Sequence, residues 1–172
     1  MASLIDNLIE TLSRESQEYD KLSELSAKKT PVIIKGDLEA LQAITDEEQL
    51  VVSKINRIDH ERRSVMKEIA GVINTDVETL KLMDLIHVLE RRPTEKQKLA
   101  VCYDKLKESV YRMKRVNDQN AALIEDALEM TRFEMNMLQA MKSAPETANY
   151  NKGAYSDGSV IGTTKGRFDA KQ

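Results

Sequence analysis

The sequence predicts an all-α fold, an elongated antiparallel helical bundle or coiled coil of long helices with one short helix and a disordered C-terminal tail. The 172 residues are 32% charged and only 4% aromatic, and they contain no Trp, a composition typical of bundles. Apolar residues recur in alternating steps of three and four, which is the period of one helix face. Pro and Gly mark the few breaks between these rows. We therefore expect residues 1–142 to form one helical-bundle domain, followed by a flexible tail at 143–172.

The first helix is expected to begin near Ser3, a residue type that favours the N-cap position. Its apolar row contains Ile5, Leu8, Leu12, Tyr19 and Leu22. We expect the helix to end before residues 28–31, Lys-Lys-Thr-Pro, because basic residues favour a helix C-terminus and Pro disfavours continuation.

A second long helix is expected to begin at Asp37, directly after Gly36. Only Glu48 and Arg62 interrupt its apolar row. The row consists of Leu41, Ile44, Val51, Ile55, Ile58, Val65, Ile69 and Val72. Such a helix would be a rod about 50 Å long, which needs packing partners along its length.

A short helix is expected next. Residues 74–78, Asn-Thr-Asp-Val-Glu, have the spacing of a capping box, and residues 92–94 would close the helix. Its apolar residues are Leu80, Met83, Ile86 and Leu89. We expect this helix to cover one end of the bundle.

The last long helix is expected at about 94–142, beginning with a second capping box formed by Thr94 and Gln97. Its first apolar row is Leu99, Cys102, Leu106, Met113, Val116, Leu123, Ala127, Met130, Met137 and Met141. A second row on an adjacent face is Ala121, Ile124, Leu128, Met135 and Leu138. One packing seam cannot cover both rows, and Met side chains adapt to different partners. The sequence therefore indicates binding rather than chemistry.

Charge and composition exclude several other classes of protein. A net charge of −3 and a pI near 5.6 argue against nucleic-acid binding, although residues 96–115 are locally basic and read as a solvated helix face. No segment has the apolar length of a membrane span, and acids interrupt the N-terminus too early for a signal peptide. The single Cys102 cannot form an internal disulfide. We therefore expect a cytoplasmic protein.

No residue pattern supports catalysis, a metal site or a cofactor. Asp84 and His87 are the only near match to the Glu-x-x-His motif of a di-iron site, which also needs further inward glutamates, and an ordinary surface histidine on the short helix is the favoured interpretation. A signalling bundle phosphorylated on His60 stays open as an alternative, against an ordinary charged helix face. Asn120 lies on the first apolar row, where it could fix the register of packing, turn to solvent, or help present a binding face.

Several segments together resemble a known family. Residues 36–41, Gly-Asp-Leu-Glu-Ala-Leu, open a long second helix, and residues 115–120, Arg-Val-Asn-Asp-Gln-Asn, lead into Leu123 and Ile124. Tyr150 and Gly153 follow the last helix. In this order and at this spacing, the segments are similar to the FlgN-like chaperones of the bacterial flagellar type III export system, over nearly the whole chain.

The resemblance implies a cytoplasmic export chaperone and not an enzyme. Its partners would be the hook-filament junction (hook-associated) proteins, whose C-terminal helices it would keep unassembled and deliver to the export apparatus. Because the family binds cargo through its C-terminal region, the implied site is Asn120, Leu123, Ile124, Ala127, Leu128, Met130, Thr131, Met135, Leu138 and Met141. The alternative is a self-associating coiled-coil adaptor or structural protein, in which the second row closes a homo-oligomer.

Overall fold

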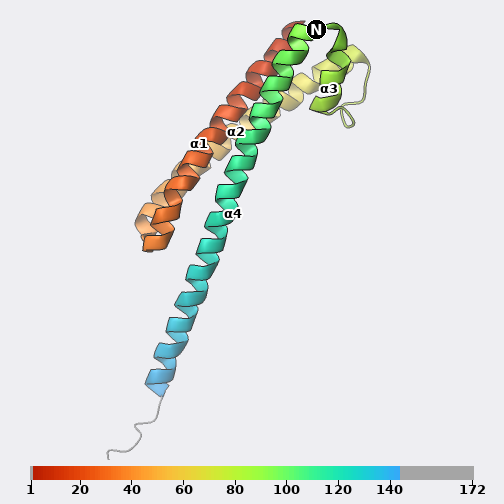
Figure 1. Ribbon diagram of the computed structural model, residues 1–172. Helices are drawn as coiled ribbons and strands as arrows, with labels where there is room; N and C mark the ends of the chain where they lie inside the picture. The colour runs from red at the N-terminus through yellow and green to blue at the C-terminus, as the bar shows by residue number, and fades with distance from the viewer. Residues whose placement is uncertain (1, 144–172) are drawn as a thin grey trace, which may run out of the picture. The chain divides into compact units, whose positions relative to one another are not determined.

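The computed structural model describes residues 2–143 (Figure 1). The helices are α1 (Ala2–Lys35), α2 (Leu38–Ile73), α3 (Leu82–Val88), the 3-10 helix η1 (Leu89–Arg91) and α4 (Pro93–Ser143). These residues contain no strand, so the predicted all-α class is confirmed. The chain divides into two units, Met1–Thr131 and Arg132–Gln172. Apart from Ser143, the predicted tail at 143–172 lies outside the described residues.

In the first unit, α1 and α2 form an antiparallel hairpin (Figure 1). The ion pairs between the two helices show that they run in opposite directions. Arg14, early in α1, pairs with Glu61, late in α2, at 2.8 Å. Lys29, late in α1, pairs with Glu48, early in α2, also at 2.8 Å. The predicted antiparallel packing of the first two long helices is confirmed.

The part of α4 in the first unit packs against this hairpin and runs parallel to α1. The hydroxyls of Ser16 and Ser109 lie 3.1 Å apart, and the hydroxyl of Thr30 donates to Asn120 Oδ1 at 2.7 Å. Residue numbers therefore rise together along α1 and α4. Since α2 runs opposite to both, the order of the three long helices is up, down, up.

The turn between α1 and α2 has the geometry of a Schellman motif. Gly36 adopts a φ of 68°, its N–H donates to the carbonyl of Ile33 at 3.0 Å, and the N–H of Asp37 donates to the carbonyl of Val32 at 3.2 Å. Asp37 then caps α2, its Oδ1 accepting from the N–H of Ala40 at 3.0 Å. The predicted start of the second helix at Asp37 is confirmed.

The predicted end of the first helix before residues 28–31 is wrong. The helix continues through Pro31 to Lys35. Pro31 lacks only one backbone donor, so the helix loses one hydrogen bond there. In return the last turns bury Ile33 and pair Lys29 with Glu48. These contacts with distant residues outweigh the local preference.

The predicted start of the short helix at residues 74–78 is also wrong. Asn74 is instead the C-cap of α2, with a left-handed φ of 54° and its N–H bonded to the carbonyl of Ala70. Asp76 forms a tight turn by accepting from the N–H of Glu78 at 3.0 Å. The helix begins only at Leu82. Asp84 Oδ2 accepts from the backbone N–H of Lys81, the residue just before the helix, at 3.0 Å. The polar side chains of this segment bond to nearby backbone and hold a turn.

The last helix begins one residue earlier than expected. Pro93 occupies its first turn, where a missing N–H costs nothing, and the carbonyl of Arg92 accepts from the N–H of Lys96 at 2.9 Å. Thr94 therefore lies inside the helix and does not cap it.

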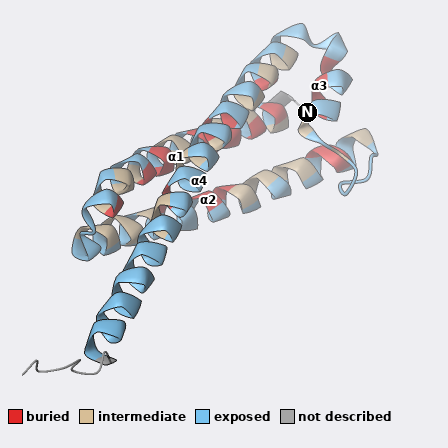
Figure 2. Ribbon diagram, turned by 60° about the horizontal axis from the view of Figure 1, so that its bottom comes forward, coloured by how far each residue is buried: buried red, intermediate tan, exposed pale blue. Residues whose placement is uncertain are grey.

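The core of the first unit consists of two clusters of buried apolar residues (Figure 2). The larger is Ile5, Leu8, Leu12, Ile69, Leu85, Ile86, Leu89, Leu99 and Leu106. The smaller is Leu22, Val51 and Ile55. Both contain residues of the rows predicted for the first two helices, although Val72, at the end of the second row, is exposed. α3 and η1 supply three residues of the larger cluster, as expected of a short helix that covers one end.

The two charged residues that interrupt the row of α2 meet polar partners on α1. Glu48 accepts from the hydroxyl of Ser26 at 2.7 Å and pairs with Lys29. Arg62 Nε lies 3.4 Å from Glu15 Oε2. Each interruption is therefore matched across the interface, which is how a polar group is accommodated inside a bundle.

Arg62 also belongs to a cluster of charges with opposite effects on two carboxyl groups. Burial raises the pKa of Glu15 above its ordinary value, while the Arg62 charge opposes this rise and the Asp59 charge adds to it. For Asp59, burial also acts to raise the pKa, but hydrogen bonds and charges from Arg62 and Arg63 outweigh it and lower the pKa. The ion pair from Arg63 Nη2 to Asp59 Oδ2 measures 2.9 Å.

Candidate binding surface

The first apolar row of α4 is covered by the hairpin only over part of its length. Leu99 and Leu106 are buried, and Met113, Val116 and Leu123 are half-buried. Every residue of α4 from 125 to 142 is exposed (Figure 2). The apolar residues near the end of the row thus have no covering helix in the described chain.

The offset between α1 and α4 explains where this cover ends in the first unit. Bonded residues of α4 and α1 differ by 90 to 94 positions. Because α1 ends at Lys35, the same offset would place residues 130–131 of α4 level with positions beyond the end of α1. The apolar surface of the first unit therefore continues past the end of its partner helix.

Six of the predicted site residues other than Asn120 lie in the first unit. Leu123 and Ile124 are half-buried, and Ala127 and Thr131 are exposed. Leu128 is 53% exposed and Met130 is 64% exposed. The remaining three, in the second unit, are also exposed: Met135, Leu138 and Met141.

Asn120 differs from the rest of the predicted set because its side chain is only 3% exposed. Its Nδ2 donates to the carbonyl of Ser26 at 2.6 Å, and its Oδ1 accepts from the Thr30 hydroxyl at 2.7 Å. Of the three interpretations left open by the sequence, this geometry supports the one in which Asn120 fixes the register. Its amide is therefore occupied by α1 and is not part of the exposed surface.

A cavity of about 290 Å³ lies where α4 passes the turn of the α1–α2 hairpin. We call it the hairpin pocket. It is lined by Val32, Ile33, Gly36, Asp37, Leu38, Leu41, Ile124, Ala127, Leu128 and Thr131. Its volume is close to the lower limit of about 300 Å³ for pockets that bind small ligands, and most of its lining is apolar. It is suited to an apolar side chain presented by a partner.

The structure thus brings four predicted residues, all from α4, together with a set that the sequence analysis missed. The missed residues of the pocket lie on both sides of the hairpin turn, and one of them, Leu38, is 76% exposed. Ile34, next to the pocket residue Ile33 in the chain, is 69% exposed. The apolar doublet of Ile33 and Ile34, so close to Leu38 and a turn glycine, was the available signal. Phe133, exposed in the second unit, was also missed.

The residues considered for chemistry have ordinary surroundings. His60 and His87 are exposed, Cys102 is a half-buried free thiol, and the carboxylate of Asp84 caps α3. Among residues 2–143, no group of three or more His, Cys, Asp or Glu side chains could hold a metal ion. Within the described residues, none of the helices has the length and apolar character needed to span a membrane.

The described helices form an all-α bundle with an apolar pocket between α4 and the turn of the α1–α2 hairpin, an architecture suited to a binding protein. A family model described as FlgN protein matches residues 1–156. The chain therefore belongs to the FlgN family of flagellar export chaperones, which confirms the family suggested by the sequence segments.

One relative is a Bacillus subtilis (strain 168) protein named Uncharacterized protein YvyG. It is 26% identical over 144 residues, which cover 84% of this chain and 83% of the relative. No solved structure matches the chain.

Proposed function

We propose that this protein is a cytoplasmic chaperone for the flagellar hook-filament junction proteins. It binds their C-terminal helices, prevents premature assembly and delivers them to the export apparatus. Membership of the FlgN family supports the chaperone role. The observation that supports the site is the exposed apolar surface of α4 beside the hairpin pocket.

In this proposal an amphipathic helix of the cargo lies along α4 and folds on binding. One of its apolar side chains enters the hairpin pocket beside Leu128, and others cover Met130. Five apolar side chains removed from water at about 1.5 to 3 kcal/mol each supply about 10 kcal/mol before the costs of association. Binding alone is sufficient to mask the cargo helix, so no catalytic group is required.

The test is calorimetric titration of the full chain with synthetic C-terminal peptides of flagellar hook-filament junction proteins. We expect a dissociation constant in the micromolar range or tighter for the wild type. Leu128→Asp should weaken binding at least about tenfold, because it places a charge at the mouth of an apolar pocket. The matched control is Leu50→Asp, which changes a leucine of α2 that is 67% exposed, against 53% for Leu128, and should leave binding unchanged.

A parallel variant, Met135→Asp/Leu138→Asp, tests the contribution of the second unit, and we expect a comparable loss of affinity. If Leu128→Asp binds as tightly as Leu50→Asp, the cargo site lies elsewhere. If the wild type binds none of the peptides and light scattering shows a stable dimer, the self-associating adaptor replaces the chaperone proposal.

A further inference from the structure

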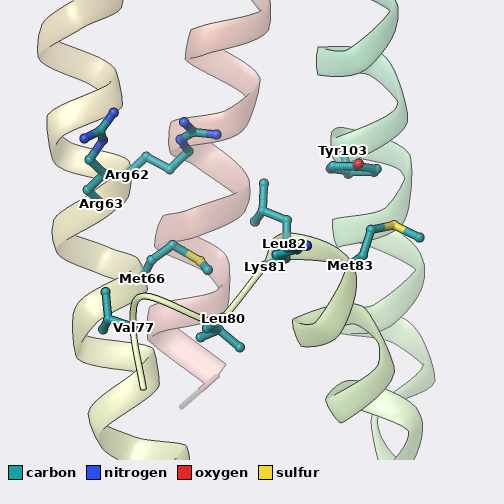
Figure 3. A pocket seen from close by; sticks show the side chains of 9 residues that line it. All are labelled: Arg62, Arg63, Met66, Val77, Leu80, Lys81, Leu82, Met83 and Tyr103. Carbon is teal, nitrogen blue, oxygen red and sulfur yellow. The ribbon is translucent and has the colours of Figure 1, made fainter. Parts of the chain in front are cut away.

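A second cavity of about 450 Å³ lies between α2, the segment joining α2 to α3, the start of α3, and α4 (Figure 3). We call it the basic pocket. Its lining residues are Arg62, Arg63, Met66, Val77, Leu80, Lys81, Leu82, Met83 and Tyr103. None of them belongs to the cargo surface proposed above. Three of the nine side chains are cationic and none is acidic, a bias opposite in sign to the net charge of the whole chain.

The walls of the basic pocket are apolar and open to solvent. Val77 is 38% exposed and Met83 is 47% exposed, so apolar surface is accessible at its opening. Met66 and Met83 have flexible thioether side chains that adjust to the shape of a ligand. Tyr103 adds an aromatic ring from α4 (Figure 3). These walls are suited to a large apolar side chain.

The cations of the basic pocket differ in how free they are to meet a ligand. Arg62 is only partly exposed and is paired with Glu15 and Asp59. Arg63 also touches Asp59, but its side chain is 76% exposed, and Lys81 is exposed as well. Arg63 and Lys81 are therefore the two positive groups that an incoming carboxylate can reach.

We propose that the basic pocket is a docking site for an acidic amphipathic segment of a second protein. An apolar side chain of that segment packs against Met66, Met83 and Tyr103. The acidic residues beside it pair with Arg63 and Lys81. The charge complementarity between the exposed cations Arg63 and Lys81 and an acidic segment determines the choice of partner. This site is independent of the proposed cargo surface.

Other ligands fit the basic pocket less well. Nucleic acid binding needs many phosphate contacts, and only three cations line the pocket in a chain of net charge −3. Recruitment to anionic membranes takes clusters of about 4 to 8 basic residues. A small ligand is normally enclosed over most of its surface, whereas this pocket exposes part of its own apolar lining. A peptide segment covers such an opening.

The probe is a fluorescein-labelled peptide of about 15 residues, long enough to form a helix. It has Leu at steps of three and four and Glu at the positions between. A matched peptide has Lys in place of every Glu. Fluorescence anisotropy is measured with the full chain, with Arg63→Glu/Lys81→Glu, and with Lys28→Glu/Lys54→Glu, which makes the same change in net charge at exposed lysines outside the pocket.

We expect the wild type to bind the acidic peptide at least about tenfold more tightly than the basic one. Arg63→Glu/Lys81→Glu should reverse this preference, whereas Lys28→Glu/Lys54→Glu should weaken acidic binding less than about threefold. Met83→Ser should weaken binding of the acidic peptide through lost apolar contact. Circular dichroism checks that each variant is folded. Leu128→Asp should leave the acidic peptide bound, which separates this site from the cargo surface.

The proposal is overturned if the acidic peptide does not bind, or if the two charge-reversal variants weaken it equally. Sedimentation of the protein with vesicles of phosphatidylserine and phosphatidylcholine tests whether the pocket binds a lipid surface. If the wild type binds vesicles but not the acidic peptide, and Arg63→Glu/Lys81→Glu abolishes vesicle binding, the pocket recognises a lipid surface and the peptide proposal is wrong.

Discussion

Among single residues, Asn120 illustrates what a sequence pattern can and cannot reveal. Its place on the apolar row of α4 was readable from spacing alone. Its partners were not, because Ser26 and Thr30 lie 94 and 90 positions away on another helix. A buried amide with both ends bonded stabilises one alignment of two helices and penalises the others.

We expect Asn120→Ala to lower the free energy of unfolding by about 2 kcal/mol. The substitution leaves the Ser26 carbonyl and the Thr30 hydroxyl without their partner in a buried interface. Urea denaturation measures the change. Asn117→Ala is the control, because Asn117 is exposed on the same helix, and it should have little effect. Equal effects of the two substitutions would contradict the structural role of Asn120.

The carboxyl group of Glu15 predicts a pH dependence of stability. Its folded-state pKa is raised above the ordinary value of 4.5, mainly by burial. Protonation is therefore favoured by folding, and this stabilisation is lost as the pH rises through the folded-state pKa. We expect the difference in unfolding free energy, wild type minus Glu15→Gln, to fall as the pH rises from about 4 to about 7. Urea denaturation across this range gives the difference.

The carboxyl group of Asp59 predicts a pH dependence of stability opposite to that of Glu15. The arginine contacts lower its pKa, so its stabilisation is present above the unfolded-state pKa and is lost as the pH falls through the folded-state value. The difference between wild type and Asp59→Asn should therefore increase as the pH rises. If both differences change in the same direction, the assigned roles of burial and of the arginines are incorrect.

At the scale of elements, α1 shows how contacts with distant residues override a local signal. The Lys-Lys-Thr-Pro segment has the features of a helix end, yet Pro31 lies inside the helix. The decisive contacts are the burial of Ile33 and the pairing of Lys29 with Glu48. Neither can be read from residues 28–31. The true end is set by Gly36, whose backbone conformation terminates the helix.

Gly36, which ends α1, and Gly71, which lies inside α2, should respond oppositely to alanine. Gly36→Ala should destabilise the protein by about 1 kcal/mol, because its φ of 68° is strained for any residue with a Cβ. Gly71→Ala, inside α2, should stabilise it by about 0.5 to 1 kcal/mol, because Ala favours helix. An added Cβ meets nothing within 4 Å at either site, so backbone conformation alone decides the sign. Thermal unfolding measures both, and stabilisation by Gly36→Ala would contradict the turn geometry.

At the scale of the whole molecule, the number of long helices, most of their boundaries and many of their buried apolar residues within residues 2–143 could be predicted from the sequence, because the 3.6-residue period depends only on local spacing. The site could be predicted only in part. Ile124 and Leu128 were found because they lie on a row. Val32 was placed in the break between the first two helices, and Leu38 lies before the apolar row of the second helix, which was taken to start at Leu41. The basic pocket joins residues from 62 to 103 and depends on how the segment after α2 folds back, which no periodic pattern describes.

The hydrogen bonds between α1 and α4 also fix how far the two helices are shifted along each other. An interface of apolar residues alone would tolerate a shift of one heptad, which moves a helix about 10 Å along its axis. Such a shift would part Asn120 from Ser26 and Thr30 and separate the hydroxyls of Ser16 and Ser109. It would also carry Leu128 past Leu38 and dismantle the hairpin pocket. A few hydroxyls and one amide therefore hold α1 and α4 at a fixed offset and keep the two sides of this pocket facing each other.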